Sequence, residues 1–311
     1  MSRMELNGYP RGWFAVCFSN EIEAGGVKPL KYFGKDLVLY RTEDGTPVIH
    51  DAICPHLGAH LGVGGTVDGC TIRCPFHAWR FDESGACVDV PYAKRIPKKA
   101  AVKTWPVRER NGCVWVWHSH SGDEPDWEIP SVPAPEDGLE WLPWHQSCLQ
   151  VKTHPREIVE NVADIAHFPV VHRTEVDTFE NIYEGHMATQ LTAGKAYPAG
   201  GGVDDFKIRA TYFGPGCQVS WMEGVLQSRL LLAHTPIDHN TLDLRFAVKI
   251  QDFGDAERGA KFAQGYADNL RIGFHEDISI WVNKKWRDQP LMCDGDGPLG
   301  RLRVWYRQFY A

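Results

Sequence analysis

Two short segments of this chain each place a cysteine and a histidine within three residues of each other, among glycines and prolines. The first reads Cys54-Pro-His56 and the second reads Cys74-Pro-Phe-His77, with 17 residues between them. Thiolates and imidazoles are metal ligands, and two such pairs complete a four-ligand site. The chain must therefore fold so that two loops, distant in sequence, meet around one metal centre.

The distribution of ligands between the loops distinguishes two kinds of metal centre. A structural zinc site also takes two cysteines and two histidines, but it usually pairs cysteine with cysteine and histidine with histidine. Here each loop supplies one of each. In a Rieske [2Fe–2S] cluster two thiolates bind one iron and two imidazoles bind the other. We therefore predict a Rieske cluster with these four ligands: Cys54, His56, Cys74 and His77.

A second group of polar residues lies in Glu160-Asn161-Val-Ala-Asp164-Ile-Ala-His167-Phe-Pro-Val-Val-His172. His167 and His172 are close enough on one helical face, loosened by Pro169, to bind one ion. Two histidines and one carboxylate form the facial triad of Fe(II) oxygenases. The third ligand must come from elsewhere, and the acidic candidates are Glu276 and Asp277.

The presence of the first motif is the reason to interpret this histidine pair as metal ligands. Two histidines five residues apart are more often unrelated side chains than ligands. A Rieske cluster, however, needs an electron acceptor, and no other segment offers one. Asp164 lies one helical turn before His167, where its carboxylate can accept a hydrogen bond from the ring. The simpler interpretation of Asp164 is an acidic residue on the exposed face of a helix.

Composition restricts the partners and the compartment. With 311 residues the chain can form two domains, and its net charge of −7 argues against nucleic acid as a partner. The sequence contains no run of 18 apolar residues and no signal-peptide core, so we expect a cytoplasmic protein without a membrane span. Nine cysteines, an odd number, indicate reduced thiols and metal ligands.

The order of apolar runs and turn residues predicts two domains, 1–120 and 121–311. The first has short β-branched and aromatic runs with hairpin turns at Glu43-Asp-Gly-Thr and Glu109-Arg-Asn-Gly. Residues 119–138 are rich in proline, glycine and acid and are expected to form the linker. The second domain should contain a helix at 155–168, strands over about 181–252, and a helix from Ala256 to about Lys285.

With both motifs identified, the chain resembles the Rieske oxygenases, and within them the oxygenase component of 3-ketosteroid 9α-hydroxylase and related sterol-modifying enzymes. The resemblance runs through nearly the whole chain. It is carried by the following segments: Tyr9-Pro-Arg-Gly-Trp13, Cys74-Pro-Phe-His-Ala-Trp-Arg80, Val90-Pro-Tyr-Ala-Lys-Arg-Ile-Pro97, Asn161 to His172, Phe179-Glu-Asn-Ile-Tyr-Glu-Gly-His186, Glu276-Asp277-Ile-Ser-Ile-Trp281, Asp296-Gly-Pro and Trp305-Tyr-Arg-Gln-Phe-Tyr310.

The resemblance implies an α+β fold, with an N-terminal all-β Rieske domain and a C-terminal catalytic domain whose antiparallel sheet is flanked by helices. It implies that Asp277, rather than Glu276, completes the iron site, and that Asn161 lies next to the ligands. It also implies a head-to-tail homotrimer. In that trimer Asp164 would bridge His167 of its own subunit and His77 of the partner subunit and so carry electrons between the two metal sites.

The predicted function is that of the terminal component of a Rieske monooxygenase. It would use O₂ at Fe(II) to hydroxylate a C–H bond of an apolar, steroid- or sterol-like substrate. No phosphate-binding glycine motif occurs outside the cluster loops, so a separate reductase or ferredoxin must deliver the electrons of NAD(P)H. Oxidative demethylation, desaturation and aromatic-ring dihydroxylation stay open. A Rieske electron-transfer protein is the alternative from another class, but it would need only residues 1–120.

Overall fold

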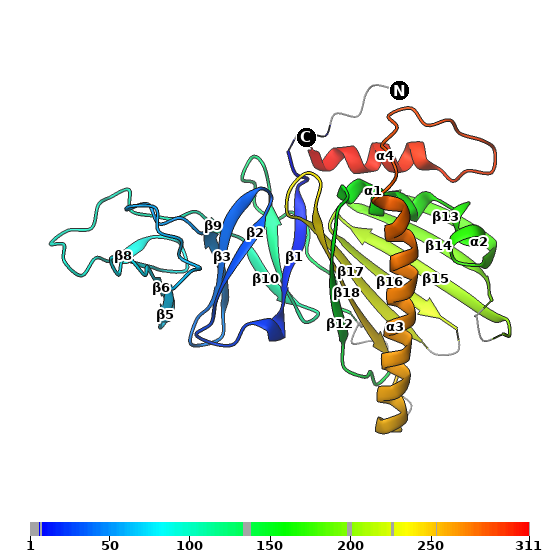
Figure 1. Cartoon of the computed structure of the whole chain (residues 1–311), viewed down its shortest axis with the longest axis horizontal. Helices are drawn as coiled ribbons and strands as arrows, with labels where there is room; N and C mark the ends of the chain where they lie inside the picture. The colour runs from blue at the N-terminus through cyan, green and yellow to red at the C-terminus, as the bar shows by residue number, and fades with distance from the viewer. Residues whose placement is uncertain are drawn as a thin grey trace.

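The computed structural model describes residue 6 and residues 8–132, 138–197, 201–224, 227–252 and 254–310. Its fold is α+β. An N-terminal part made of three small sheets is followed by a long antiparallel sheet covered by helices (Figure 1). In the described part of the chain no helix is both long and apolar enough to cross a membrane.

The N-terminal part is built from short antiparallel strands. The sheet orders are β1-β11-β10, β2-β3-β4-β9 and β5-β6-β7-β8. The strands are β1 (Gly12–Phe18), β2 (Val27–Tyr32), β3 (Lys35–Arg41), β4 (Pro47–Asp51), β5 (Thr66–Asp68), β6 (Thr71–Arg73), β7 (Arg80–Phe81), β8 (Cys87–Asp89), β9 (Thr104–Trp105), β10 (Val107–Arg110) and β11 (Cys113–His118), with a 3₁₀ turn η1 (Ser19–Glu21) after β1.

The two predicted hairpin turns join neighbouring strands of these sheets. Between β10 and β11, Asn111 and Gly112 have φ angles of 57° and 72°, the pair of positive values that a tight type I′ hairpin requires. The turn at 43–46 joins β3 to β4 and has Gly45 at a φ of 95°. All residues of β1 and β11 are buried, because both strands are covered on two faces.

The C-terminal part is one seven-stranded antiparallel sheet of order β12-β18-β17-β16-β15-β14-β13. Its strands are β12 (His145–Val151), β13 (Thr174–Glu184), β14 (Met187–Ala196), β15 (Asp204–Phe213), β16 (Cys217–Glu223), β17 (Ser228–Pro236) and β18 (Leu242–Ile250). Most of the sheet lies in the predicted strand-rich stretch. The edge strand β12 was not predicted, and β13 begins seven residues before position 181.

The helices differ from the prediction in one important place. They are α1 (Pro155–Glu160), η3 (Asn161–Ala163), α2 (His167–Val171), α3 (Ala256–Trp281), α4 (Leu299–Arg307) and η4 (Gln308–Tyr310). The single helix predicted at 155–168 is wrong, because the chain is extended at Asp164. Pro169 has no N–H to bond Ile165 and its ring would clash with that carbonyl in a continuous helix, whereas proline is accepted in the first turn of a new one.

The long sheet is covered on both faces, and its alternating side chains join the two parts of the molecule. Leu231 packs in one apolar cluster with Trp13 and Trp115 of the N-terminal part. Its neighbour Leu232 packs in another cluster with Phe274 of α3 on the opposite face. Helix α3, which ends four residues before the predicted Lys285, runs across that second face (Figure 1).

Candidate metal centres and cavity

The loop that carries Cys54 and His56 lies between β4 and β5 and is closed by its own backbone. The Cys54 N–H donates to the Ala59 carbonyl at 2.9 Å, and the Gly58 N–H donates to the Cys54 carbonyl at 3.0 Å. Gly58 has a φ of 79°, which glycine adopts at no steric cost. The loop therefore turns back on itself directly after His56.

The loop that carries Cys74 and His77 repeats this backbone pattern between β6 and β7. The Cys74 N–H donates to the Trp79 carbonyl at 2.8 Å, and the Ala78 N–H donates to the Cys74 carbonyl at 3.1 Å. Ala78 takes the place of Gly58 and has a φ of 60°, although a side chain makes this conformation cost about 1 kcal/mol. Local strain of this kind is typical of a segment that must present particular side chains.

The four predicted cluster ligands come together at the tip of the N-terminal part. The Cys54 and Cys74 side chains are buried, and the His56 and His77 ring centroids lie 4.6 Å apart. Burial, together with the adjacent Cys74, raises the pKa of the Cys54 thiol to about 11. Within the described residues, the buried Nδ1 atom of the partly exposed His77 has no hydrogen-bond partner. Two buried thiols side by side, and an imidazole nitrogen without a partner, fit a metal cluster.

A second metal-binding group lies in the C-terminal part. One ligand atom from each of His167, His172 and Asp277 lies within 4.8 Å of the other two, and no other such group of three is found among the described residues. His167 begins α2, His172 directly follows it, and Asp277 comes from α3. Asp277 is 8% exposed, and its Oδ1 lies 3.4 Å from Nε2 of His172. A buried carboxylate facing two imidazoles has the composition of a 2-His-1-carboxylate iron site.

The two acidic candidates of α3 occupy different positions around His172. Asp277 faces Nε2, whereas Oε2 of Glu276 lies 3.5 Å from Nδ1 on the other side of the ring. Burial lowers the pKa of His172, but the two carboxylates outweigh it and the pKa is raised. Glu276 is thus placed to orient the imidazole, a contact that the sequence alone did not reveal.

Asp164 and Asn161 also lie next to this group, but Asp164 contacts His167 differently from the prediction. The closest hydrogen bond of His167 Nδ1, at 2.8 Å, goes to the backbone carbonyl of Asp164, while the carboxylate Oδ2 is 3.7 Å away. The extended backbone at Asp164 turns the carbonyl rather than the side chain toward the ring. The contact with His167 lowers the pKa of the half-exposed Asp164 carboxyl. Asn161 Oδ1 accepts a hydrogen bond from Trp281 Nε1 at 3.2 Å.

A cavity of about 620 Å³ adjoins the His167, His172 and Asp277 group, between α3 and the sheet. Its wall is mostly apolar, as in most small-molecule sites. The apolar lining includes Ile158, Val162, Phe168, Phe206, Ile208, Met222, Leu230, Leu232, Leu270, Ile272, Phe274 and Trp281. The polar lining away from the metal-binding group includes Gln190, Gln218, Ser220 and Asn269. The cavity can therefore hold an apolar molecule of considerable size and contact a few polar groups on it.

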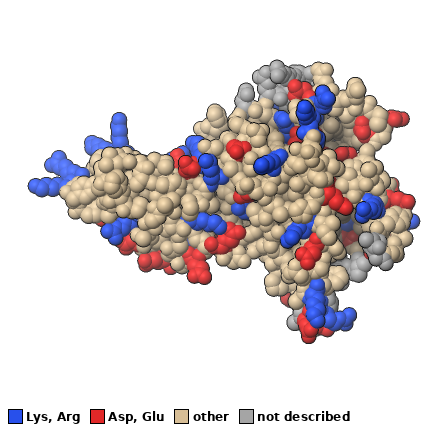
Figure 2. Space-filling model, in the orientation of Figure 1, with Lys and Arg blue, Asp and Glu red and all other residues tan. Residues whose placement is uncertain are grey.

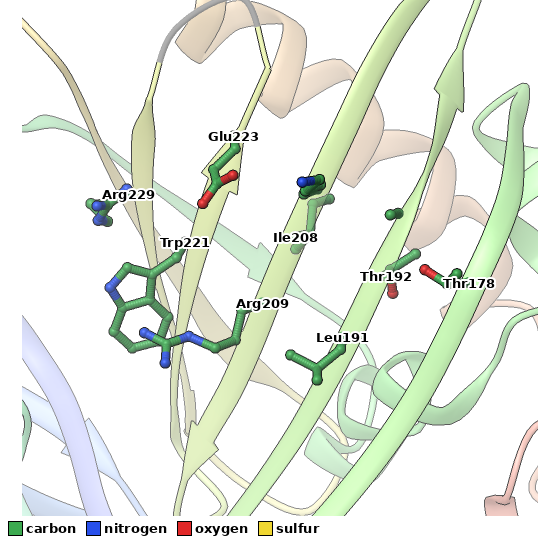
Figure 3. Close-up of a pocket in the computed structure, with 10 residues that line it drawn as sticks. Thr178, Leu191, Thr192, Ile208, Arg209, Trp221, Glu223 and Arg229 are labelled. Carbon is green, nitrogen blue, oxygen red and sulfur yellow. The ribbon is translucent and has the colours of Figure 1, made fainter.

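A second hollow, of about 470 Å³, lies on the opposite face of the same sheet (Figure 3). Strand alternation places Trp221 in this hollow and Met222 in the first, although Ile208 lines both. In Figure 3 the Arg209 guanidinium reaches the Trp221 ring, and the two groups are 4.0 Å apart. The metal-binding group does not line this hollow, so the cavity beside α3 is the candidate active site.

Two protein families match this chain in succession. Residues 12–106 match the Rieske [2Fe-2S] domain, and residues 116–310 match the 3-ketosteroid 9alpha-hydroxylase C-terminal domain. The first match contains both cysteine–histidine loops, and the second contains His167, His172 and Asp277.

Curated relatives match nearly the whole chain. A 3-ketosteroid-9-alpha-monooxygenase oxygenase component of Rhodococcus rhodochrous is 36% identical over 321 residues, covering 97% of this chain and 82% of the relative. The enzyme with the same description from Mycobacterium tuberculosis is 32% identical, with the same coverage. Cholesterol 7-desaturase of Caenorhabditis elegans is also 32% identical, covering 97% of this chain and 77% of its own.

Solved structures share the fold at low sequence identity. Dicamba monooxygenase bound to dicamba superimposes with a TM-score of 0.76 at 21% identity, covering 97% of this chain and 98% of the other. NdmA of Pseudomonas putida CBB5 with caffeine gives 0.73 at 21% identity, covering 96% and 89%. At this level of identity the likeness concerns the architecture alone.

Proposed function

The chain belongs to the Rieske non-haem iron oxygenases, and we propose that it is a terminal monooxygenase component that hydroxylates a C–H bond of a steroid- or sterol-like substrate. One observation carries the choice of substrate class: a large apolar cavity adjoins the His167, His172 and Asp277 group. The identity of 36% with a 3-ketosteroid-9-alpha-monooxygenase oxygenase component supports it. We also place the domain boundary near residue 120.

Two metal sites would carry the redox chemistry. The cluster would be held by Cys54, Cys74, His56 and His77, and its electrons would come from NAD(P)H through a separate reductase. Fe(II) would be held by His167, His172 and Asp277. When bound, this iron supplies O₂ activation, because a facial triad leaves neighbouring coordination positions open for O₂ and solvent.

The protein around the iron site orients the ligands and excludes water. His167 Nδ1 donates to the Asp164 carbonyl, so the proton is fixed on that nitrogen and Nε2 stays free to bind metal. Glu276 orients His172 from the opposite side of its ring. The apolar wall excludes bulk water from the reacting C–H bond and limits side reactions.

The cavity also suggests how a long substrate is positioned. Asn269 and Asp277 both line it and are eight residues apart on α3, which corresponds to about 12 Å along the helix. A rigid fused-ring molecule can therefore lie along α3, with a polar group near Asn269 and a ring carbon near the metal-binding group. A flat, single-ring substrate would leave most of this apolar wall uncovered.

Desaturation is the second candidate reaction, because a cholesterol 7-desaturase is also among the relatives. Both outcomes begin with attack on an unactivated C–H bond, so the same cavity would serve either. A purely electron-transferring role is disfavoured, since it leaves the His167, His172 and Asp277 group and its cavity without a purpose.

The deciding experiment combines metal analysis with turnover. We expect three iron atoms per chain, two in the cluster and one at the second site. With a surrogate reductase, NADH and a panel of 3-ketosteroids and sterols, mass spectrometry should detect a product heavier by one oxygen atom. A product lighter by two hydrogens would favour the desaturase. Two iron atoms per chain and no product would contradict the proposal.

A further inference from the structure

Strand β16 places two polar side chains next to each other in the floor of the cavity beside α3. Gln218 and Ser220, hereafter the floor pair, are two residues apart, so they point to the same face of the sheet, and both line the cavity. Ser220 is 4% exposed and Gln218 is partly buried. Their register partners on β17, Leu232 and Leu230, also line the cavity, so the floor pair lies in an otherwise apolar wall.

The protein leaves the hydrogen-bonding groups of the floor pair unused. Two other polar side chains of the cavity floor are already paired, because Gln190 Nε2 donates to Thr192 Oγ1 at 2.5 Å and the Tyr212 hydroxyl lies 3.3 Å from His234 Nε2. The floor pair, by contrast, makes no side-chain hydrogen bond with any residue that the structure describes. A polar group in an apolar wall is costly unless a ligand or water pairs with it, and such groups usually fix the orientation of a ligand.

The charges around the cavity favour an uncharged partner for the floor pair. Figure 2 shows Lys and Arg at several separate places on the visible surface, but Arg173 is the only one of them in the cavity lining among the described residues. Arg173 lies 4.0 Å from Glu276, next to the metal-binding group, so an acid already matches its charge. A carboxylate or phosphate at the floor pair would be buried without a counter-ion. A neutral oxygen atom avoids this cost.

The donors of the floor pair fit a carbonyl oxygen. The Gln218 amide offers two N–H donors and the Ser220 hydroxyl offers one O–H donor. A carbonyl oxygen accepts two hydrogen bonds and needs no acceptor in return. The two Cα atoms are about 7 Å apart along the strand, so the longer Gln218 side chain can reach an atom above Ser220.

The floor pair lies away from the metal-binding group. The rings of Phe168 in α2 and Phe179 in β13 are 6.4 Å apart between centroids, so α2 packs on β13. Strand β16 is three strands farther into the sheet, which corresponds to about 14 Å. A carbonyl bound there would belong to a part of the substrate remote from the C–H bond under attack, which suits a long fused-ring molecule.

We propose that Gln218 and Ser220 bind a ketone oxygen of a fused-ring substrate, and so determine which molecules are accepted and which ring carbon faces the metal-binding group. The inference rests on the proposed function, because it takes this cavity as the substrate site. The contact would add to the polar contact near Asn269, which is exposed at the cavity rim. A molecule without this ketone would leave both donors unpaired and would be rejected.

Ligand binding without turnover tests the inference. The holoenzyme, without O₂ or reductase, is titrated by calorimetry with androstane-3,17-dione and with the two monoketones, androstan-3-one and androstan-17-one. The test variant carries Gln218→Met and Ser220→Ala, which remove the hydrogen-bonding groups and nearly keep the volume. The control variant carries Gln264→Met and Ser131→Ala, the same exchanges at exposed positions.

The wild-type protein and the control variant should bind one of the monoketones at least about 10-fold more weakly than the diketone, because the missing ketone leaves the floor pair unpaired. In the test variant this ratio should fall to about 2-fold or less, because no donor remains to be left unpaired. The test variant should also unfold at the wild-type temperature or above it, since removing unpaired polar groups from an apolar wall does not destabilise a protein.

Three results would overturn the inference and leave the proposed function standing. They are an unchanged ratio in the test variant, equal binding of all three steroids by the wild-type protein, and an unfolding temperature of the test variant clearly below that of the wild type. If none of the three steroids binds to the wild-type protein, the proposed substrate class is wrong, and the inference is wrong with it.

Discussion

At the residue scale, the proposed cluster ligands are distinguished from the other cysteines by what surrounds them. Cys54→Ala or Cys74→Ala should abolish the paramagnetic signal of the reduced Rieske cluster, because one iron would lose half of its thiolate ligands. Cys70→Ala is the matched control, since Cys70 is exposed and lies outside both loops. Electron paramagnetic resonance of the dithionite-reduced proteins checks this, and an unchanged signal in either buried variant would rule out that ligand.

The neighbouring acids of α3 give a second prediction at this scale. Asp277→Ala should lose the mononuclear iron and all turnover but keep the cluster, so iron should fall from three atoms to two per chain. Glu276→Gln should keep the iron, because an amide can still hydrogen bond to Nδ1 of His172. Complete loss of such an orienting contact usually lowers metal affinity or activity by about 10- to 100-fold, and the glutamine variant should avoid this loss. If only Glu276→Gln lost iron, Glu276 would be the iron ligand and Asp277 the orienting residue.

The cysteines and histidines proposed as ligands could be predicted from sequence, because their chemistry is carried by ligand type and spacing, whereas Asp277 was implied only by the family resemblance. The contact of Glu276 with His172 could not, because it depends on how α3 is rotated against the sheet. Nor could the choice between Glu276 and Asp277 be made from spacing alone, since adjacent helical residues differ only in the face they occupy.

At the element scale, the segment 155–171 illustrates where sequence patterns are insufficient. Apolar spacing predicted one helix, whereas α1, η3 and α2 are separated by an extended residue, Asp164. The strand-rich stretch at about 181–252 was easier to predict, because strands leave a regular pattern of apolar residues and turns, whereas the antiparallel sheet was implied by the resemblance. The break is fixed by contacts from distant segments. Asn181 Nδ2, from β13, donates to the Val162 carbonyl at 2.7 Å.

Gly297 also packs closely against this break, next to the Ala163 carbonyl, and provides the third prediction. A Cβ at this position would collide with the Ala163 carbonyl oxygen, so any side chain must push the turn that precedes Asp164. Gly297→Ala should therefore lower the free energy of unfolding by about 2–3 kcal/mol, as overpacking does, and reduce turnover. Gly295→Ala is the control, because no atom lies within 4 Å of the methyl group that alanine would add there. Thermal unfolding and turnover of both variants test it, and equal behaviour would contradict the steric role.

At the scale of the whole molecule, the two metal-binding groups lie in different parts of the chain. The cluster loops lie at the far end of the N-terminal part, whereas α2 and α3 lie on the far side of the C-terminal sheet (Figure 1). The N-terminal part packs on the face of the sheet opposite to α3. Electron transfer between the proposed cluster and iron of one chain would have to cross the molecule. The head-to-tail homotrimer that we propose would instead place the cluster of one subunit beside the iron of the next.

Asp164 is the residue through which this assembly can be tested. Its carboxylate is half exposed, and the contact with His167 keeps its pKa low, so it is ionised at neutral pH. We propose that the free side of this carboxylate accepts a hydrogen bond from His77 of the partner subunit, which a charge strengthens. Asp164→Asn keeps the volume but removes the charge. The variant should stay folded, trimeric and reducible at its cluster, yet reoxidise the cluster at least about 10-fold more slowly.

Rapid mixing of the reduced protein with substrate and O₂ measures this reoxidation directly. Asp177→Asn, an exposed acid on the adjacent strand β13, removes the same charge without touching His167 and should reoxidise at the wild-type rate. Because His167 bonds the backbone carbonyl of Asp164, the asparagine variant should also retain its mononuclear iron. A slow rate with full iron occupancy therefore separates electron transfer from metal binding. A wild-type rate in Asp164→Asn would return this residue to the role of an ordinary exposed acid.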